Sequence, residues 1–484
     1  MRGRVRPFRG AYPLAAVLLA LVAAPAAAQQ AAPDPLLLVD RPGLTVRAHL
    51  GAGVNAVVES GLFWDLAAIF SPQARYEPDK AWLEAYVEPG LSFEAALADG
   101  LLAYGRVSTV ISGTVGEDAY AIGDTGRATL EQGHLGLRFG APGAPFSLDL
   151  SAGRQDYRAG TGMLIANGGS NGFERGALKL GPRKAWEMTA IARARAGILS
   201  ADLFYLDANE LSDNDSETRI VGGTLRSDPS EGTHLGATLA TVQRSRSPYV
   251  RAVPGGPPTI LPGARDGLTF VNAFARAEPL PEAVPGLWIS AEGAYQWNDR
   301  IDLAAVGGRV EIGRVLSELP WRPTLSYAYQ AFSGDDPATA RLERFDPLFY
   351  EGSPRAWATG SKSSMVFINT NVQAHLLTLA LAPSPRDILT FRYAHIRAVE
   401  LRSPLQFGQA TRVAASGGAP ALVAGVTHPH LSDDLFVEYT RVVTPNAFLT
   451  VGASVSFPGE GIDRVAGGRA PAWVGGFANL VIEY

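Results

Sequence analysis

Apolar and polar residues alternate along many short segments of the chain. From Leu44 to Asn55, one set of alternate positions is apolar, and the other set is polar or glycine. The same alternation recurs between positions 83 and 94, and around Leu148, Leu287 and Val310. A period of two residues predicts β-strands with one apolar and one wet face. A soluble β-sandwich would show the same alternation, so the pattern alone does not identify the architecture.

The connections between these segments have two alternating lengths. Tight connections such as Asp99-Gly100 and 383–387 take turns with long ones such as 159–182 and 333–362. Long loops at one end and short turns at the other are typical of outer-membrane barrels, with the short turns in the periplasm. The expected fold is therefore all-β: a single transmembrane antiparallel β-barrel of about 18 strands, with long extracellular loops and short periplasmic turns. The strands are expected to begin near 44, 81, 99, 127, 145, 183, 197, 216, 232, 266, 286, 301, 321, 363, 386, 430, 446 and 471.

The last segment of the chain supports the barrel. Alternate positions from Gly476 to Tyr484 are small, apolar or aromatic, and the chain ends on an aromatic residue, as the terminal strand of an outer-membrane barrel does. Because hydrocarbon offers no hydrogen-bond partner, this strand is expected to pair with the first. The soluble alternatives, a sandwich or a β-solenoid, are less favoured because the sequence shows no repeat of fixed period.

The N-terminus predicts export from the cytoplasm. Four arginines precede an apolar run from Leu14 to Ala24, and Ala26 and Ala28 form an A-x-A cleavage site. We expect residues 1–28 to be a signal peptide, 29–43 a short periplasmic segment and 44–484 the barrel. The expected location is the cell outer membrane of a Gram-negative type of cell. The chain has no cysteine, which excludes lipoprotein acylation and disulfides.

One glycine-rich stretch raises the question of nucleotide binding. Gly160, Thr161 and Gly162 form a G-x-G within GRQDYRAGTGMLIANGG, which begins at Gly153. A dinucleotide fingerprint needs a buried strand before the glycines and a helix after them. Here an alternating strand precedes the glycines and turn-forming residues follow them, so we interpret the stretch as a strand that passes into an external loop.

Three segments together resemble the alginate export family of outer-membrane proteins. They are GRQDYRAGTGMLIANGG followed by LGPRKAWE, then YAYQAFSGDDPATARLERFDPLFYEG, and finally DDLFVEYTRVVTPNAFLTVGASVSFPGEGI. The resemblance extends over most of the mature chain. It implies an 18-stranded barrel that conducts an anionic polysaccharide outward through an arginine-rich constriction.

The polar face of each strand is expected to line the pore, since a barrel of this size encloses water. Arginine suits uronates because its planar fork binds both carboxylate oxygens and keeps its charge. The competing interpretation is that arginines and acids pair across neighbouring strands and stiffen the wall. The expected pore-lining and substrate-binding residues are Arg47, His49, Glu84, Arg106, Arg138, Arg193, Glu292, Arg309, Glu311 and Asn371. Asn371 is expected in a neutral ladder with Asn369, Gln373 and His375.

No catalytic residue, metal ligand set or cofactor is expected. The histidines lack metalloenzyme spacing, and His428-Pro429-His430 is expected in a loop without a metal. The main functional hypothesis is a channel for an alginate-like uronate polymer or related anions, and a general or small-solute porin is the alternative. An outer-membrane enzyme is the third. The expected partners are outer-membrane lipid, an anionic polysaccharide or small anionic solute, and periplasmic export proteins. We expect a monomer and no nucleic acid partner.

Overall fold

A computed structural model describes residues 35–65, 77–141, 143–352, 356–360, 367–407, 410–411, 413–414 and 425–484. The predicted signal peptide lies outside these residues. None of the described helices is long and apolar enough to cross a membrane.

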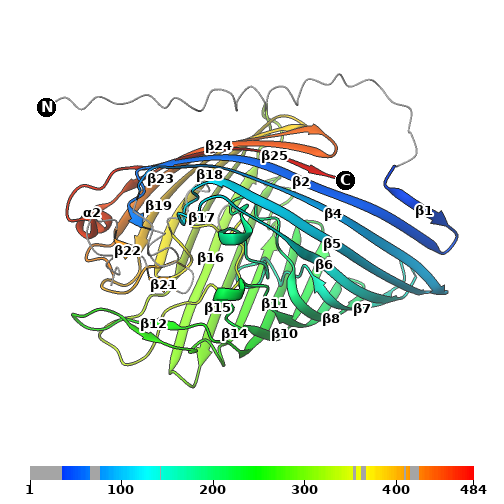
Figure 1. Ribbon diagram of the computed structural model, residues 1–484, viewed down its shortest axis with the longest axis horizontal. Helices are drawn as coiled ribbons and strands as arrows, with labels where there is room; N and C mark the ends of the chain where they lie inside the picture. Colours follow the sequence, from blue (N-terminus) through cyan, green and yellow to red (C-terminus); the bar gives the residue numbers. More distant parts are fainter. Residues whose placement is uncertain are drawn as a thin grey trace.

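Eighteen antiparallel strands form a closed barrel (Figure 1), which confirms the predicted fold class. Each strand pairs with the next barrel strand along the chain, and the last strand pairs with the first. Seventeen strands begin within three residues of the positions that the alternation predicts. The eighteen barrel strands, of which only β18 starts further from its predicted position, are β2 (Leu44–Ser60), β4 (Lys80–Ala98), β5 (Leu101–Gly116), β6 (Thr125–Phe139), β7 (Phe146–Gln155), β8 (Trp186–Ala196), β9 (Leu199–Asp207), β10 (Arg219–Ser230), β11 (Thr233–Arg244), β14 (Thr269–Ala277), β15 (Leu287–Asn298), β16 (Leu303–Val315), β17 (Thr324–Phe332), β18 (Val372–Ser384), β19 (Asp387–Ala398), β23 (His430–Thr444), β24 (Ala447–Pro458) and β25 (Trp473–Glu483).

The barrel closes along β2, which has partners on both of its edges. β25 pairs with β2 from Gly51 to Ser60, and the backbones of Leu50 and Tyr484 exchange two hydrogen bonds of 3.1 and 2.9 Å. Beyond the end of β25, a short strand β1 (Leu37–Arg41) pairs with the first residues of β2. β1 lies within the predicted N-terminal segment, and it pairs with the part of β2 that β25 does not reach.

The outer face of the barrel is apolar, as a lipid-facing wall requires. Leu50, Val87 and Val310 are 40, 44 and 57% exposed, although their neighbours in each strand are polar or small. Alternation places those neighbours on the inner face. The sequence pattern therefore assigns the two faces of these strands correctly.

Most connections alternate in length as predicted. Two residues join β4 to β5, β8 to β9, β10 to β11, β18 to β19, and β23 to β24. The opposite end carries the long loops 61–79, 156–185, 245–268, 333–371 and 399–429, but β15 and β16 are joined there by only 299–302. We name this end the loop end and the other the turn end.

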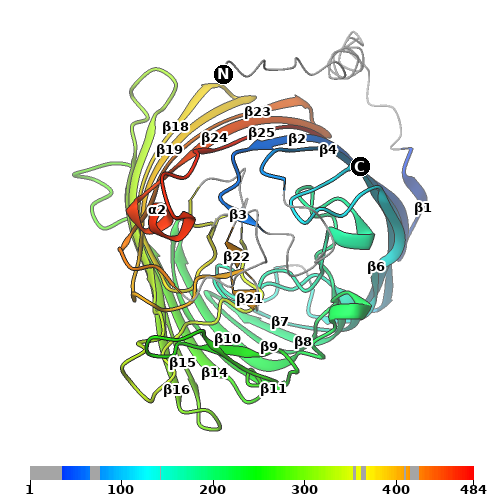
Figure 2. The ribbon, with the colours of Figure 1, turned by 60° about the vertical axis from the view of Figure 1, so that its left-hand side comes forward.

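Several loop segments fold back into the barrel. Figure 2 shows three of them, β3, β21 and β22, inside the ring of strands. β3 (Trp64–Asp65) pairs with β22 (Val413–Ala414), and β20 (Gln406–Phe407) pairs with β21 (Ala410–Thr411). A separate hairpin consists of β12 (Tyr249–Arg251) and β13 (Thr259–Leu261). The remaining loop elements are the helix α2 (Glu460–Ala466) and the 3-10 turns η1 (Phe173–Arg175) and η2 (Ser212–Asn214).

Candidate functional site

The inner wall near the turn end carries five arginines that line two pockets. Four of them, Arg47, Arg106, Arg138 and Arg193, are predicted pore residues, and Arg195 is an addition. The first pocket, of about 430 Å³, is lined by Arg47 and Arg106 with His134, and the second, of about 600 Å³, by the other three. Arginine at five wall positions gives this part of the lumen a concentrated positive charge.

Only two carboxylates line the same pockets. Glu94 belongs to both pockets, and Asp149 belongs to the second. The second pocket also includes residues 140–144 of the turn between β6 and β7, which fixes its position at the turn end. Five guanidinium groups therefore line these pockets together with two carboxylates, so the pocket lining is net positive.

Part of this charge is neutralised by pairing across strands. Nε of Arg138 lies 3.0 Å from Oδ2 of Asp149, which also accepts a hydrogen bond at Oδ1 from the Tyr104 hydroxyl. Nε of Arg193 lies 3.7 Å from Asp202. Within the described part of the chain, Arg106 and Arg195 form no ion pair. The wall-pairing interpretation thus holds for Arg138 and Arg193, whereas Arg106 and Arg195 present their charge to the lumen.

His49 also faces inward, where its Nε2 lies 2.7 Å from the hydroxyl of Ser92. Glu311 occupies an inward position of β16, opposite Ala328 of β17. Both positions agree with the predicted face.

Three predicted pore residues face inward but are covered by loops, which sequence parity could not indicate. Glu84 is fully buried and accepts hydrogen bonds from the Asn55 side chain and the Lys179 backbone. Glu292 is 9% exposed and accepts hydrogen bonds from Thr161 and Asn272. These carboxylates attach loop 156–185 to the wall and do not line open water.

Arg309 is likewise an attachment point. Its guanidinium donates to the side-chain oxygen of Gln330 at 2.9 and 2.5 Å and to the carbonyl of Ala356 at 2.8 Å. It also stacks over the Trp357 ring at 4.2 Å. Because Gln330 belongs to the wall and Ala356 and Trp357 belong to the loop, Arg309 holds segment 356–360 against the wall.

Asn371 differs most from the prediction. It precedes β18 in a left-handed conformation, with φ of 50°, and its side chain is hydrogen-bonded to Glu400 and Ser403. The strand starts at Val372, about nine residues after the predicted start near 363. Gln373 and His375 then lie on the outer face. The Tyr329 hydroxyl donates a hydrogen bond to the side-chain oxygen of Gln373, and the Tyr327 hydroxyl is hydrogen-bonded to Nδ1 of His375. The predicted neutral lumenal ladder is therefore wrong.

Two of the loops meet inside the barrel. Ile165 of loop 156–185 forms a parallel β-bridge with Phe349 of loop 333–371, and the backbone of Glu351 donates to the carbonyl of Gly162 at 2.9 Å. The indole of Trp357 donates to the Thr161 hydroxyl at 3.0 Å. The glycine-rich stretch is thus a docking segment for the second loop. Gly162 has a φ of +86°, which glycine adopts without strain.

Buried arginines anchor these loops, and none of them is among the predicted site residues. Arg265 forms two bonds to Asp346, at 2.8 and 2.9 Å, with both side chains nearly buried. Arg183 donates to Thr129 and Ser112 on the wall. Arg183 and Asp346 fall in the segments LGPRKAWE and RLERFDPLF that carry the family resemblance, which is the one signal that could have found them.

Burial lowers the pKa of two loop arginines but leaves both protonated. Loss of water lowers the pKa of Arg183 and of Arg344 to about 10 in each case. Both groups remain cationic at neutral pH. Arg344 is 1% exposed, and its guanidinium lies 5.3 Å from the centre of the Tyr249 ring. These charges belong to the interior of the loops and are not available to a solute.

Asp335 has a role in loop folding. Its carboxylate accepts backbone hydrogen bonds from Ala252 at 2.6 Å and Glu343 at 2.9 Å, and its own backbone donates to Ser403. It therefore connects loop 333–371 to loops 245–268 and 399–429.

Comparison with known proteins shows the fold and no nearer relationship. No family model matches the chain, and no curated protein matches it. Among solved structures, Acinetobacter baumannii OccAB1 is 9% identical with a TM-score of 0.50, over 91% of this chain and 96% of that one. Pseudomonas aeruginosa OccK9 (OpdG) is 11% identical with a TM-score of 0.49, over 91% and 98%. Salmonella typhi OmpF, solved in complex with daunomycin, is 10% identical with a TM-score of 0.43, over 91% and 98%. The likeness to OccAB1 is one of fold, and it agrees with the closed antiparallel barrel of this chain.

Proposed function

We propose that the protein is an outer-membrane porin that conducts small solutes and prefers anions. The observation that carries this proposal is the excess of arginine over carboxylate in the two wall pockets at the turn end. At about 6 Å and an effective dielectric of 20 to 80, one such charge stabilises a passing carboxylate by about 0.7 to 3 kcal/mol. Several arginines in series are therefore enough for selectivity without trapping the solute.

The loops favour small solutes over a polymer. Loops 156–185 and 333–371 are bridged inside the barrel and are anchored by Glu292 and Arg309. A uronate polymer would have to keep several sugar units threaded between these loops at once, whereas a monomer or dimer crosses this region as one short unit. The small-solute porin was the alternative hypothesis from sequence, and it fits the described structure better. The alginate-like cargo of the family resemblance, and the periplasmic export partners, stay predictions.

Because fold alone does not fix function, the porin proposal rests on the wall chemistry. The proposal also includes an outer-membrane location, a monomeric state and no enzymatic activity.

The test is conductance in a planar lipid bilayer. The purified protein should form open channels, and the reversal potential under a KCl gradient should indicate a preference for chloride. This preference should weaken above a few hundred millimolar salt, because screening shortens the reach of the wall charges. A protein that inserts but does not conduct would rule out the porin, while a cation preference would rule out only the anion selectivity. Block of the current by oligouronates of increasing length then tests whether a uronate polymer can enter the channel.

A further inference from the structure

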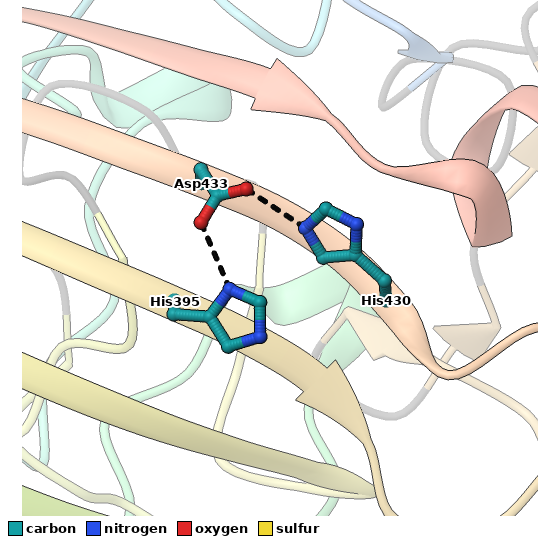
Figure 3. Close-up of side chains that lie close together, drawn as sticks. All are labelled: His395, His430 and Asp433. Atoms are coloured by element: carbon teal, nitrogen blue, oxygen red, sulfur yellow. Dashed lines mark hydrogen bonds and ion pairs between the residues drawn. The ribbon is translucent and has the colours of Figure 1, made fainter.

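Two histidines and an aspartate come together on the outer face of the barrel. His395 of β19 is directly opposite Asp433 of β23, and His430 begins β23 (Figure 3). In the same strands, Tyr393 and Leu435 are 39 and 48% exposed, which identifies this as the lipid-facing side. The cluster lies at the loop end, since β19 ends and β23 begins at loop 399–429.

A β-bulge brings His430 to this face. The pairing runs from Ile396–Ser432 to Arg397–His430, so Leu431 has no partner of its own. Strict alternation would point Leu431 outward and His430 inward. Instead Leu431 is fully buried, and His430 lies on the same side as Asp433. Bulges frequently re-aim a side chain beside a functional site.

The three side chains present their ligand atoms to one another. Nδ1 of His395 lies 2.8 Å from Oδ1 of Asp433, and Nε2 of His430 lies 2.9 Å from Oδ2. These atoms all lie within 4.8 Å of one another. Tetrahedral Zn²⁺ with bonds of about 2.0 to 2.2 Å needs its ligand atoms about 3.4 Å apart. Small side-chain rotations are therefore sufficient to place the three atoms around one ion.

The cluster is also accessible and of suitable chemistry. The side chains of His395, His430 and Asp433 are 30, 29 and 34% exposed. Imidazole and carboxylate together suit Zn²⁺, Cu²⁺ or Ni²⁺, whereas Ca²⁺ and Mg²⁺ prefer oxygen ligands alone. Three protein ligands leave a fourth position for water or an oxygen from outside the protein.

We propose that His395, His430 and Asp433 form a binding site for one divalent transition-metal ion, such as Zn²⁺, on the outer face at the loop end. The competing role is a purely structural one, in which Asp433 holds both rings by hydrogen bonds and links β19 to β23. The proposal does not depend on the porin function, because the site lies on the opposite side of the wall from the lumen.

The test uses protein without a polyhistidine tag, purified in detergent and stripped with a chelator. Titration calorimetry with ZnCl₂ should give one site per chain. H395Q, H430Q and D433N should each weaken Zn²⁺ binding at least tenfold. H375Q is the matched control: His375 is opposite His395, its ring lies 6.4 Å away, and its Nδ1 is 2.7 Å from the Tyr327 hydroxyl. H375Q should bind as the unmodified protein does.

A second measurement on the unmodified protein keeps the test independent of variant folding. With one equivalent of CuCl₂, the electron paramagnetic resonance spectrum should show coupling to two imidazole nitrogens. Absence of saturable Zn²⁺ binding, a Cu²⁺ spectrum without nitrogen coupling, or equal binding by the three site variants would overturn the proposal. Loss of binding in H375Q would overturn the assignment of the ligands.

Discussion

Arg265 and Asp346 form a bidentate ion pair between two different loops, with N–O distances of 2.8 and 2.9 Å. Gln296 on the wall is bonded to the backbone of the same aspartate in both directions, at 2.7 and 2.8 Å. Loops 245–268 and 333–371 are thereby fixed to each other and to β15. The structure thus holds loop 333–371 in the barrel through contacts that can be removed one at a time.

Asp346→Asn should loosen loop 333–371. Removing one partner of a buried ion pair costs about 3 to 5 kcal/mol, because the remaining charge stays buried without compensation. We expect larger and noisier single-channel currents and faster proteolysis within residues 333–371. Asp213→Asn, at an exposed loop position, is the control and should change neither. Unchanged currents in Asp346→Asn would show that this loop does not restrict the pore.

Replacing Arg47, Arg106, Arg138, Arg193 and Arg195 together by glutamine should lower the anion preference of the channel. The wall would lose five positive charges and keep Glu94 and Asp149. The reversal potential under a salt gradient should move toward cation preference, most strongly at low salt. Arg314→Gln is the matched control, because Arg314 alternates with the exposed Ile312 and so lies on the outer face. A reversal potential that does not move would mean that these arginines only stiffen the wall.

Arg309→Lys should disturb the loops although it preserves the charge. A lysine cannot reproduce the forked contact with Gln330, and it loses the planar stacking on Trp357. We expect current noise similar to that of Arg309→Gln, with little change in reversal potential. If Arg309→Lys behaves like the unmodified protein while Arg309→Gln loses anion preference, Arg309 acts on solutes through its charge.

An epitope tag should report the orientation of the barrel. A tag inserted after Gly255, at the open tip between β12 and β13, should be accessible on intact cells, because this hairpin is at the loop end. A tag after Gly197, in the two-residue turn between β8 and β9, should be accessible only after the outer membrane is permeabilised. Antibody labelling in the reverse pattern would invert the predicted topology.

The sequence by itself determined the strands, their order and the face of most of their residues. The period of two is a local property: Leu50 faces outward and Arg47 inward because successive side chains of a strand point to opposite sides. The same pattern, with the alternation of loop lengths, was sufficient to predict a closed barrel. No contact between distant residues was needed for these conclusions. The gathering of arginines at the turn end emerged only from the structure.

The tertiary structure decided which inward residues meet water and where the alternation breaks. Glu84 and Arg309 follow the predicted parity, yet loops from distant parts of the chain cover them. Asn371 lies outside its strand because its amide is bonded to loop 399–429, and His430 faces outward because of the bulge at Leu431. Loop docking and bulges depend on contacts between segments far apart in sequence, and such contacts leave no periodic signal in the chain.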